Sequence, residues 1–444
     1  MRKITVLIIL LVIAMFFGET AITFSFKNPV VLPDEENISF ALKLANEDSD
    51  HESTEGVDAL IESFMKRYNI KGASVAISNH ERLVYAKGFG IANSETGETV
   101  QPGHLFRIAS VSKLITAVAI LTLYEQGKVS LDQSVFGPSG ILNEAKFLNY
   151  KDPDIEKITI RHLLNHSAGW SFPMGDPVFN TLFVAGEMNL DKPSADVDDM
   201  IAYSLNRKLY RTPGKYYSYS NLGYVVLGRI IEEISGIPYY DYVHINILKP
   251  LGIIDMHIGK NFYHEKYPNE VMYFEPAGSP KILSCDGSGR MVSLPYGGNP
   301  IELLGAAGGW IASAPELLKL ISAVDGFDNQ PDILSKETIK MMTDSEVAGR
   351  GLFGWRGTDN HGTWWRTGTF TGSTALIIRQ DNGLNWAILL NTSTYHRKGL
   401  HNILSRTIFA ATYRTKEWPD VDLFVEKYHN LQWPASISAV NPEL

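Results

Sequence analysis

The feature that most constrains the fold is a pair of strand patterns near the C-terminus. Apolar residues dominate "STALIIRQ" (373–380) and "LNWAILLNTS" (384–393), and Asp-Asn-Gly at 381–383 separates the two runs. Such a tripeptide between two strand-like runs is typical of a tight β-hairpin. A further run, "GTWWRTGTF" (362–370), precedes the hairpin. We therefore expect an antiparallel sheet at this end of the chain.

The other end of the chain shows a similar pattern. "GASVAISNHERLVYAKGFG" (72–90) predicts two antiparallel strands joined at its polar "NHE" break, and 57–70 places its apolar residues on one helical face. A final apolar helix is expected over 397–412. The stretch from 125 to 345 is helical and rich in loops, with its clearest helix at 225–236.

These patterns predict an α+β fold with two lobes. One antiparallel sheet, built from both ends of the chain and flanked by the terminal helices, forms a sheet lobe from 56–100 and 345–415. The middle, 101–344, forms a helical lobe. The chain has 444 residues, and cores of that size usually divide, so a site between the lobes is expected.

Charge and cysteine content exclude some functions. The net charge is −9 and no block of Lys and Arg interrupts the sequence, so nucleic acid is not expected as a partner. Cys285 is the single cysteine, so the chain has no intrachain disulfide.

The N-terminus predicts export. Arg2 and Lys3 precede an apolar run from Ile4 to Phe17, which is typical of a secretory signal and short for a membrane span. We expect residues 1–25 to be a signal peptide or an uncleaved anchor, and the protein to be periplasmic, secreted or anchored to the cell envelope. An acidic, solvated linker is expected over 26–55, and a C-terminal tail over 416–444.

The strongest candidate for chemistry is Ser110 with Lys113, in "RIASVSKLITAVAIL" (107–121). Residues three apart lie on one helical face, and a serine nucleophile needs a base within hydrogen-bond reach. The spacing alone is weak, because Ser63 and Lys66 repeat it on an ordinary amphipathic helix. The alternative is a structural role, in which Ser110 caps the helix and Lys113 is an ordinary surface residue.

A second candidate is Tyr219-Ser220-Asn221, on a turn just before a helix. Ionising a tyrosine at pH 7 costs roughly 4 kcal/mol, and a nearby ammonium such as that of Lys113 offsets this cost. Tyr219 taken alone also fits a structural aromatic residue in a tyrosine-rich loop.

The third candidate is Arg366-Thr367-Gly368, on the strand before the hairpin. Glycine lets a substrate lie along a strand edge, and the N–H of Thr369 is expected to form an oxyanion hole with the N–H of Ser110. Arg366 is expected to bind a substrate carboxylate through both arms of its guanidinium.

Five segments in order resemble the serine β-lactamase-like superfamily. They are "LFRIASVSKLITAVAIL", "ITIRHLLNHSAGW", the stretch from "PGKYYSYSNLGY" to "ILKPLGI", "AAGGWIASAPELLKLI" and "RTGTFTGSTALII". That superfamily includes class C β-lactamases, D-alanyl-D-alanine carboxypeptidases, penicillin-binding proteins and esterases, and the similarity covers roughly 57–412.

The resemblance implies roles for the candidate residues. Ser110 would be the acylated nucleophile, Lys113 its partner, and Tyr219 the general base that later protonates the leaving group. Asn221 would bond the substrate amide or the Lys113 ammonium. The third motif of the family begins with Lys or His, whereas this chain has Arg366, which cannot shuttle a proton.

The sequence thus predicts an exported serine hydrolase that cleaves an amide or ester through an acyl-enzyme, on a small-molecule or peptide substrate. The alternative is a binding or scaffold protein that kept the fold and lost turnover. No cofactor or metal is expected: His162 and His166 have a spacing typical of zinc ligands, but no carboxylate completes the pattern.

Overall fold

The computed structural model describes residues 38–172, 175–344, 352–359, 361–392 and 399–425. The chain forms two units, 1–38 and 39–444, and the helices and strands named in this section all belong to the second. The predicted signal segment, 1–25, lies outside the described residues. No helix among the residues described is long and apolar enough to cross a bilayer.

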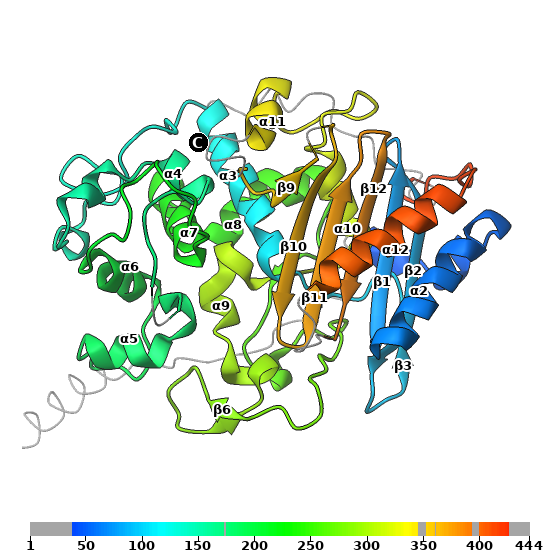
Figure 1. Cartoon of the computed structure of the whole chain (residues 1–444), viewed down its shortest axis with the longest axis horizontal. Coiled ribbons are helices and arrows are strands. Elements are labelled where there is room, and N and C mark those ends of the chain that lie inside the picture. The colour runs from blue at the N-terminus through cyan, green and yellow to red at the C-terminus, as the bar shows by residue number, and fades with distance from the viewer. Residues whose placement is uncertain (1–37, 173–174, 345–351, 360, 393–398, 426–444) are drawn as a thin grey trace, which may run out of the picture. The chain divides into compact units, whose positions relative to one another are not determined.

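The main sheet draws its strands from both ends of the chain, as predicted (Figure 1). Its order is β3-β2-β1-β12-β11-β10-β9, and every neighbouring pair is antiparallel. The strands are β1 (Gly72–Asn79), β2 (Arg82–Asn93), β3 (Glu98–Thr99), β9 (Gly357–Thr358), β10 (Trp364–Phe370), β11 (Ser373–Arg379) and β12 (Leu384–Leu390). The first and last strands therefore meet at the centre, where β1 pairs with β12.

The central strands of the sheet, β1, β11 and β12, are buried on both faces, which explains why they are largely apolar. Helices α2 (Glu55–Tyr68) and α12 (Leu400–Arg414) cover one face, where Val75, Trp386 and Ile388 belong to the same core cluster as residues of both helices. Alternate residues such as Ala387 and Leu389 pack into the larger core on the other face. Burying a Leu or Ile side chain contributes about 1.5–3 kcal/mol, so both faces stabilise the sheet.

The middle of the chain supplies most of the helices. They are α3 (Ser112–Glu125), α4 (Ile160–Leu164), α5 (Thr181–Glu187), α6 (Val197–Leu205), α7 (Asn221–Ser235), α8 (Tyr239–Val243), α9 (Ile301–Leu304), α10 (Ala314–Ser322) and α11 (Lys336–Thr343). Helix α10 departs from the predicted division, because it packs on β1 and β12 instead of in the helical lobe.

Two small sheets in this region were not predicted. One has the order β4-β8-β5 (Phe106–Arg107, Trp310–Ala312 and His257–Ile258), and the other pairs β6 with β7 (Ile282–Leu283 and Met291–Val292). Strands of two or three residues are too short to show an alternating pattern, so the sequence carried no signal for them.

The predictions of a solvated linker and of a tail need correction at their described ends. Residues 40–54 form short 3₁₀ turns at Phe40–Lys43, Asn46–Ser49 and Glu52–Thr54, and the Phe40 side chain is 3% exposed. The Phe40 ring meets that of Phe424, with centroids 5.5 Å apart. The N–H of Leu423 donates to the carbonyl of Leu83 at 2.8 Å. A few apolar residues within polar stretches are enough to anchor both segments. These residues were missed in the sequence because the linker was classified by its many acidic side chains.

Candidate active site

Ser110 lies in a tight turn, Ala109–Val111, that runs directly into α3. Ala109 has φ +48°, a left-handed conformation that is costly for a residue with a Cβ and is concentrated at functional sites. The N–H of Ile108, just before the turn, donates to the carbonyl of Trp310 at 3.0 Å. The strand upstream and the buried helix downstream therefore hold Ser110 in place.

Lys113 lies one helical turn later and is completely buried. Its Nζ donates to Ser110 Oγ at 3.3 Å, to Asn221 Oδ1 at 2.7 Å and to the carbonyl oxygen of Ala307. Two partners were expected for Asn221, the substrate amide and the Lys113 ammonium, and the structure shows the hydrogen bond with Lys113. An ammonium has three N–H groups, and three acceptors surround this one.

Tyr219 is the second side chain that contacts the Ser110 hydroxyl. Its Oη lies 2.8 Å from Ser110 Oγ, while the residue as a whole is 38% exposed. The turn that carries it is held by Ser220, which caps α7 by accepting a bond from the N–H of Gly223 at 3.1 Å. The structure therefore brings Ser110, Lys113, Tyr219 and Asn221 together, although Lys113 and Asn221 are 108 positions apart.

The electrostatics of this cluster separate the roles of its members. Burial lowers the pKa of Lys113 to about 8, and this burial effect outweighs the opposing attraction of Tyr219. Burial of the Tyr219 hydroxyl raises its pKa, but the positive charges of Lys113 and Arg366 more than offset this and bring the pKa to about 7. Tyr219 therefore loses its proton before Lys113 does, which leaves a phenolate beside an ammonium.

The structure surrounds the Arg366 guanidinium with acceptors of the protein itself. The side chain is 1% exposed, and its Nε donates to the Ser110 carbonyl at 2.7 Å and its Nη2 to Tyr219 Oη at 3.1 Å. Its Nη1 donates to the carbonyl of Trp355 at 3.3 Å. Each of the three guanidinium nitrogens thus donates to a protein acceptor, and almost none of the side chain is accessible to a substrate carboxylate. Instead it favours the ionised form of Tyr219.

This geometry predicts the effect of Arg366→Ala. Loss of the charge and of the bond to Tyr219 should raise the pKa of Tyr219, so that activity near pH 7 falls roughly 10- to 100-fold. Kinetics on a carboxylate-bearing ester and on its neutral amide-capped analogue should show the same loss. A rise in KM confined to the carboxylate-bearing ester would restore the role first predicted.

Gly368 lies where β10 crosses the Ser110 turn. A Cβ at this position would stand 2.1 Å from the carbonyl oxygen of Ile108 and 2.9 Å from the nitrogen of Ser110, so only glycine fits.

The direction of the Thr369 N–H follows from the hydrogen bonding of β10. The carbonyl of Trp365 accepts a hydrogen bond from the N–H of Arg356, on the side of β10 away from β11, and Thr369 lies four residues further along the strand. Alternation along the strand points the N–H of Thr369 to that same side. Beyond Trp365, this edge of β10 pairs with no strand within the described residues.

We expect Gly368→Ala to impair both fold and site. The new methyl group must displace the Ser110 turn or β10, which should lower the free energy of unfolding by about 1–3 kcal/mol. A shift of the turn by about 1 Å should cost about 10²-fold in kcat/KM. Urea unfolding and ester kinetics measure the two effects, and Gly56→Ala, where the backbone is not left-handed and a Cβ meets nothing within 4 Å, controls for the added methyl group.

Two residues of the site, His166 and Asp176, were not assigned to it from the sequence. His166 is 3% exposed, has φ +59° and lies outside α4, and its ring centroid is 4.4 Å from that of Tyr219. Burial, with help from Arg366 and Lys113, lowers the pKa of His166 well below its usual value, so it stays neutral. Asp176 Oδ2 accepts from the N–H groups of Asn221 at 2.7 Å and Leu222 at 3.3 Å. Both residues fix the turn that carries Tyr219 and Asn221.

His162 and His166, considered for a metal, do not share a helix, because α4 ends at Leu164. Across the described ranges, no three His, Cys, Asp or Glu side chains are grouped as metal ligands.

An antiparallel sheet flanked by helices, with a Ser-Lys-Tyr cluster between the sheet and a helical region, defines the β-lactamase/transpeptidase-like fold. The chain belongs to the Beta-lactamase family, whose model matches residues 57–408.

Several known proteins are similar to this chain. Esterase EstB of Burkholderia gladioli is 29% identical over 202 residues, which are 45% of this chain and 50% of the esterase. The matched curated relatives are thus covered over about half their length. Among solved structures, the octameric penicillin-binding protein homologue from Pyrococcus abyssi has 28% identity and a TM-score of 0.61, covering 82% of this chain and 78% of that one. D-amino acid amidase from Ochrobactrum anthropi SV3 shares the fold, with 21% identity and a TM-score of 0.64; the similarity covers 83% of this chain and 100% of the amidase.

Proposed function

We propose that this protein is a serine hydrolase that cleaves an ester or amide through an acyl-enzyme on Ser110. The observation that carries the proposal is the single hydrogen-bonded set formed by Ser110 Oγ, Lys113 Nζ and Tyr219 Oη. A hydroxyl becomes a competent nucleophile when a base of pKa near the working pH lies within hydrogen-bond reach. Tyr219, with a pKa of about 7, meets both conditions.

Each step of the reaction then has a residue. The Tyr219 phenolate accepts the Ser110 proton as Oγ attacks the substrate carbonyl carbon. The positive charge of the Lys113 ammonium stabilises the negative charge that passes from the phenolate to the tetrahedral intermediate. The carbonyl oxygen becomes an oxyanion, which the N–H groups of Ser110 and Thr369 stabilise. Tyr219 returns the proton to the leaving alcohol or amine as the bond breaks. Water, activated in the same way, hydrolyses the acyl-enzyme and restores Ser110.

Within this class we favour a neutral ester over a peptide ending in a free carboxylate. The reason is Arg366, whose guanidinium is bonded to Ser110, Trp355 and Tyr219 and is almost fully buried. The similarity to an enzyme named as an esterase agrees with this preference.

Trapping the acyl-enzyme tests the proposal. The full chain would be incubated with p-nitrophenyl acetate or with a fluorescent penicillin, quenched in acid and digested. We expect a covalent adduct on the peptide containing Ser110, with release of p-nitrophenolate, and no adduct on Ser110→Ala. If the wild type forms no adduct and turns over no faster than that variant, the chain is a binding protein that kept the fold.

We also propose that residues 1–25 direct export. The support is the apolar run after Arg2 and Lys3. Fractionation of cells that express the full chain and a chain lacking 1–25 tests it. Equal distribution of the two proteins between cytoplasm and envelope would refute export.

A further inference from the structure

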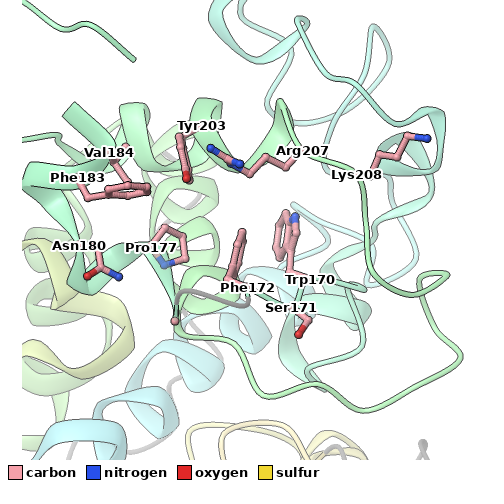
Figure 2. A pocket seen from close by; sticks show the side chains of 11 residues that line it. Trp170, Ser171, Phe172, Pro177, Asn180, Phe183, Val184, Tyr203, Arg207 and Lys208 are labelled. Carbon is pink, nitrogen blue, oxygen red and sulfur yellow. The ribbon is translucent and has the colours of Figure 1, made fainter. Parts of the chain in front are cut away.

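A cavity of about 160 Å³ lies in the helical region, between α5, α6 and residues 170–172 and 175–180 (Figure 2). Aromatic side chains contribute to two of its walls: Figure 2 shows the rings of Trp170 and Phe172 on one side and Tyr203 across from them. Trp170 is 4% exposed and Tyr203 9%. A cavity of about 150 Å³ holds one benzene-sized molecule, so this one accommodates a single ring or a short hydrocarbon chain.

One wall of the cavity is cationic. The Arg207 guanidinium extends toward Tyr203, with its carbon 4.1 Å from the ring centroid, whereas the Lys208 ammonium points away (Figure 2). Arg207 forms an ion pair with Glu187, a 3.2 Å contact in which both side chains are about half exposed. Exposed pairs of this kind are weak, and a guanidinium has further N–H groups to donate.

The charged side chains of the lining are cations. Among the described residues that line the cavity, Arg207 and Lys208 carry a charge and none is Asp or Glu. An apolar cavity whose charged lining residues are both cations is complementary to an apolar anion.

The cavity walls connect directly to the candidate active site. The carbonyl of Trp170 accepts a bond from Ser218 Oγ at 2.8 Å, and Ser218 immediately precedes Tyr219. On another wall, Pro177 follows Asp176, which holds the N–H groups of Asn221 and Leu222. Both segments that fix the turn of Tyr219 and Asn221 therefore also line the cavity.

We propose that this cavity binds a small apolar carboxylate, and that its occupancy alters hydrolysis at Ser110. The ring or chain packs between Trp170, Phe172 and Tyr203, and the carboxylate accepts hydrogen bonds from Arg207. Binding restrains the segments at Trp170 and Pro177, and through Ser218 and Asp176 it restrains the catalytic turn. This site goes beyond the proposed function, since binding does not require turnover.

Calorimetric titration of the full chain carrying Ser110→Ala measures binding apart from catalysis. We expect phenylacetate to bind saturably and about tenfold more tightly than phenylacetamide, which has the same shape without the charge. Arg207→Gln should abolish this preference. Lys208→Gln, the adjacent cation that points away, should leave it unchanged, and thermal unfolding would verify that both variants are folded.

Kinetics on the chain with Ser110 intact measure the coupling. Phenylacetate should change kcat for p-nitrophenyl acetate at saturating ester, and Arg207→Gln should abolish the change. Absence of saturable binding, or equal binding of acid and amide, would overturn the site. Purely competitive inhibition that is equally strong in Arg207→Gln would place phenylacetate at Ser110 and overturn the proposal. If no variant hydrolyses esters but the titration succeeds, the proposed function fails and the binding site stands.

Discussion

Replacing Ser110 by alanine is expected to lower kcat/KM for an activated ester by roughly 10⁴- to 10⁶-fold, to the level of the uncatalysed reaction assisted by binding alone. The Oγ atom lies within hydrogen-bond reach of both Lys113 Nζ and Tyr219 Oη, at 3.3 and 2.8 Å. Its removal takes away the atom that forms the new bond, and the remaining pair has nothing to activate. The release of p-nitrophenolate from p-nitrophenyl acetate by the wild type and by the variant measures the fall in kcat/KM.

The fold offers an internal control for this result. Ser63 and Lys66 have the same spacing as Ser110 and Lys113, but both lie on the exposed side of α2. Ser63→Ala should therefore leave kcat/KM within about twofold of the wild type. Thermal unfolding should show both variants folded, because neither hydroxyl fills core volume. Ser110→Ala activity above about 1% of the wild type would exclude Ser110 as the nucleophile.

Replacing Tyr219 by phenylalanine should reduce kcat/KM by about 10²- to 10⁴-fold, the usual contribution of a general base. Phenylalanine keeps the ring, which contacts His166, and removes the oxygen that receives the Ser110 proton. Tyr216→Phe is the matched control, since Tyr216 lies on the same loop and its exposed ring contacts Arg211. A loss of the same size in both variants would mean that the loop, and not the phenol, was disturbed.

The pH dependence of kcat/KM provides a second readout of the same residue. Activity needs Tyr219 ionised, so it should rise as the pH increases through about 7. It also needs Lys113 protonated, so it should fall as the pH passes about 8. The result is a narrow bell between these values. In Tyr219→Phe the rising limb near 7 should disappear, and a limb that persists there would assign it to another group.

Much of the fold follows from local patterns that the sequence displays. The Asp-Asn-Gly turn and its two flanking runs predict β11 and β12, and Gly236, at φ +73°, ends α7 as expected. The short strands of the middle region and the packed turns at 40–54 had no such signal. They exist because particular apolar residues meet partners far along the chain, which a local pattern cannot reveal.

By itself, the sequence determined the set of residues that could react, because Ser110, Lys113, Tyr219 and Asn221 lie in motifs with recognisable order and spacing. The tertiary structure decided what Arg366 does. Its role depends on which groups surround the guanidinium, and these come from positions 110, 219 and 355. The tertiary structure likewise gave Tyr219 the lowered pKa that suits it to the proposed role of base, since burial and two neighbouring positive charges, not sequence spacing, fix the pKa of this phenol.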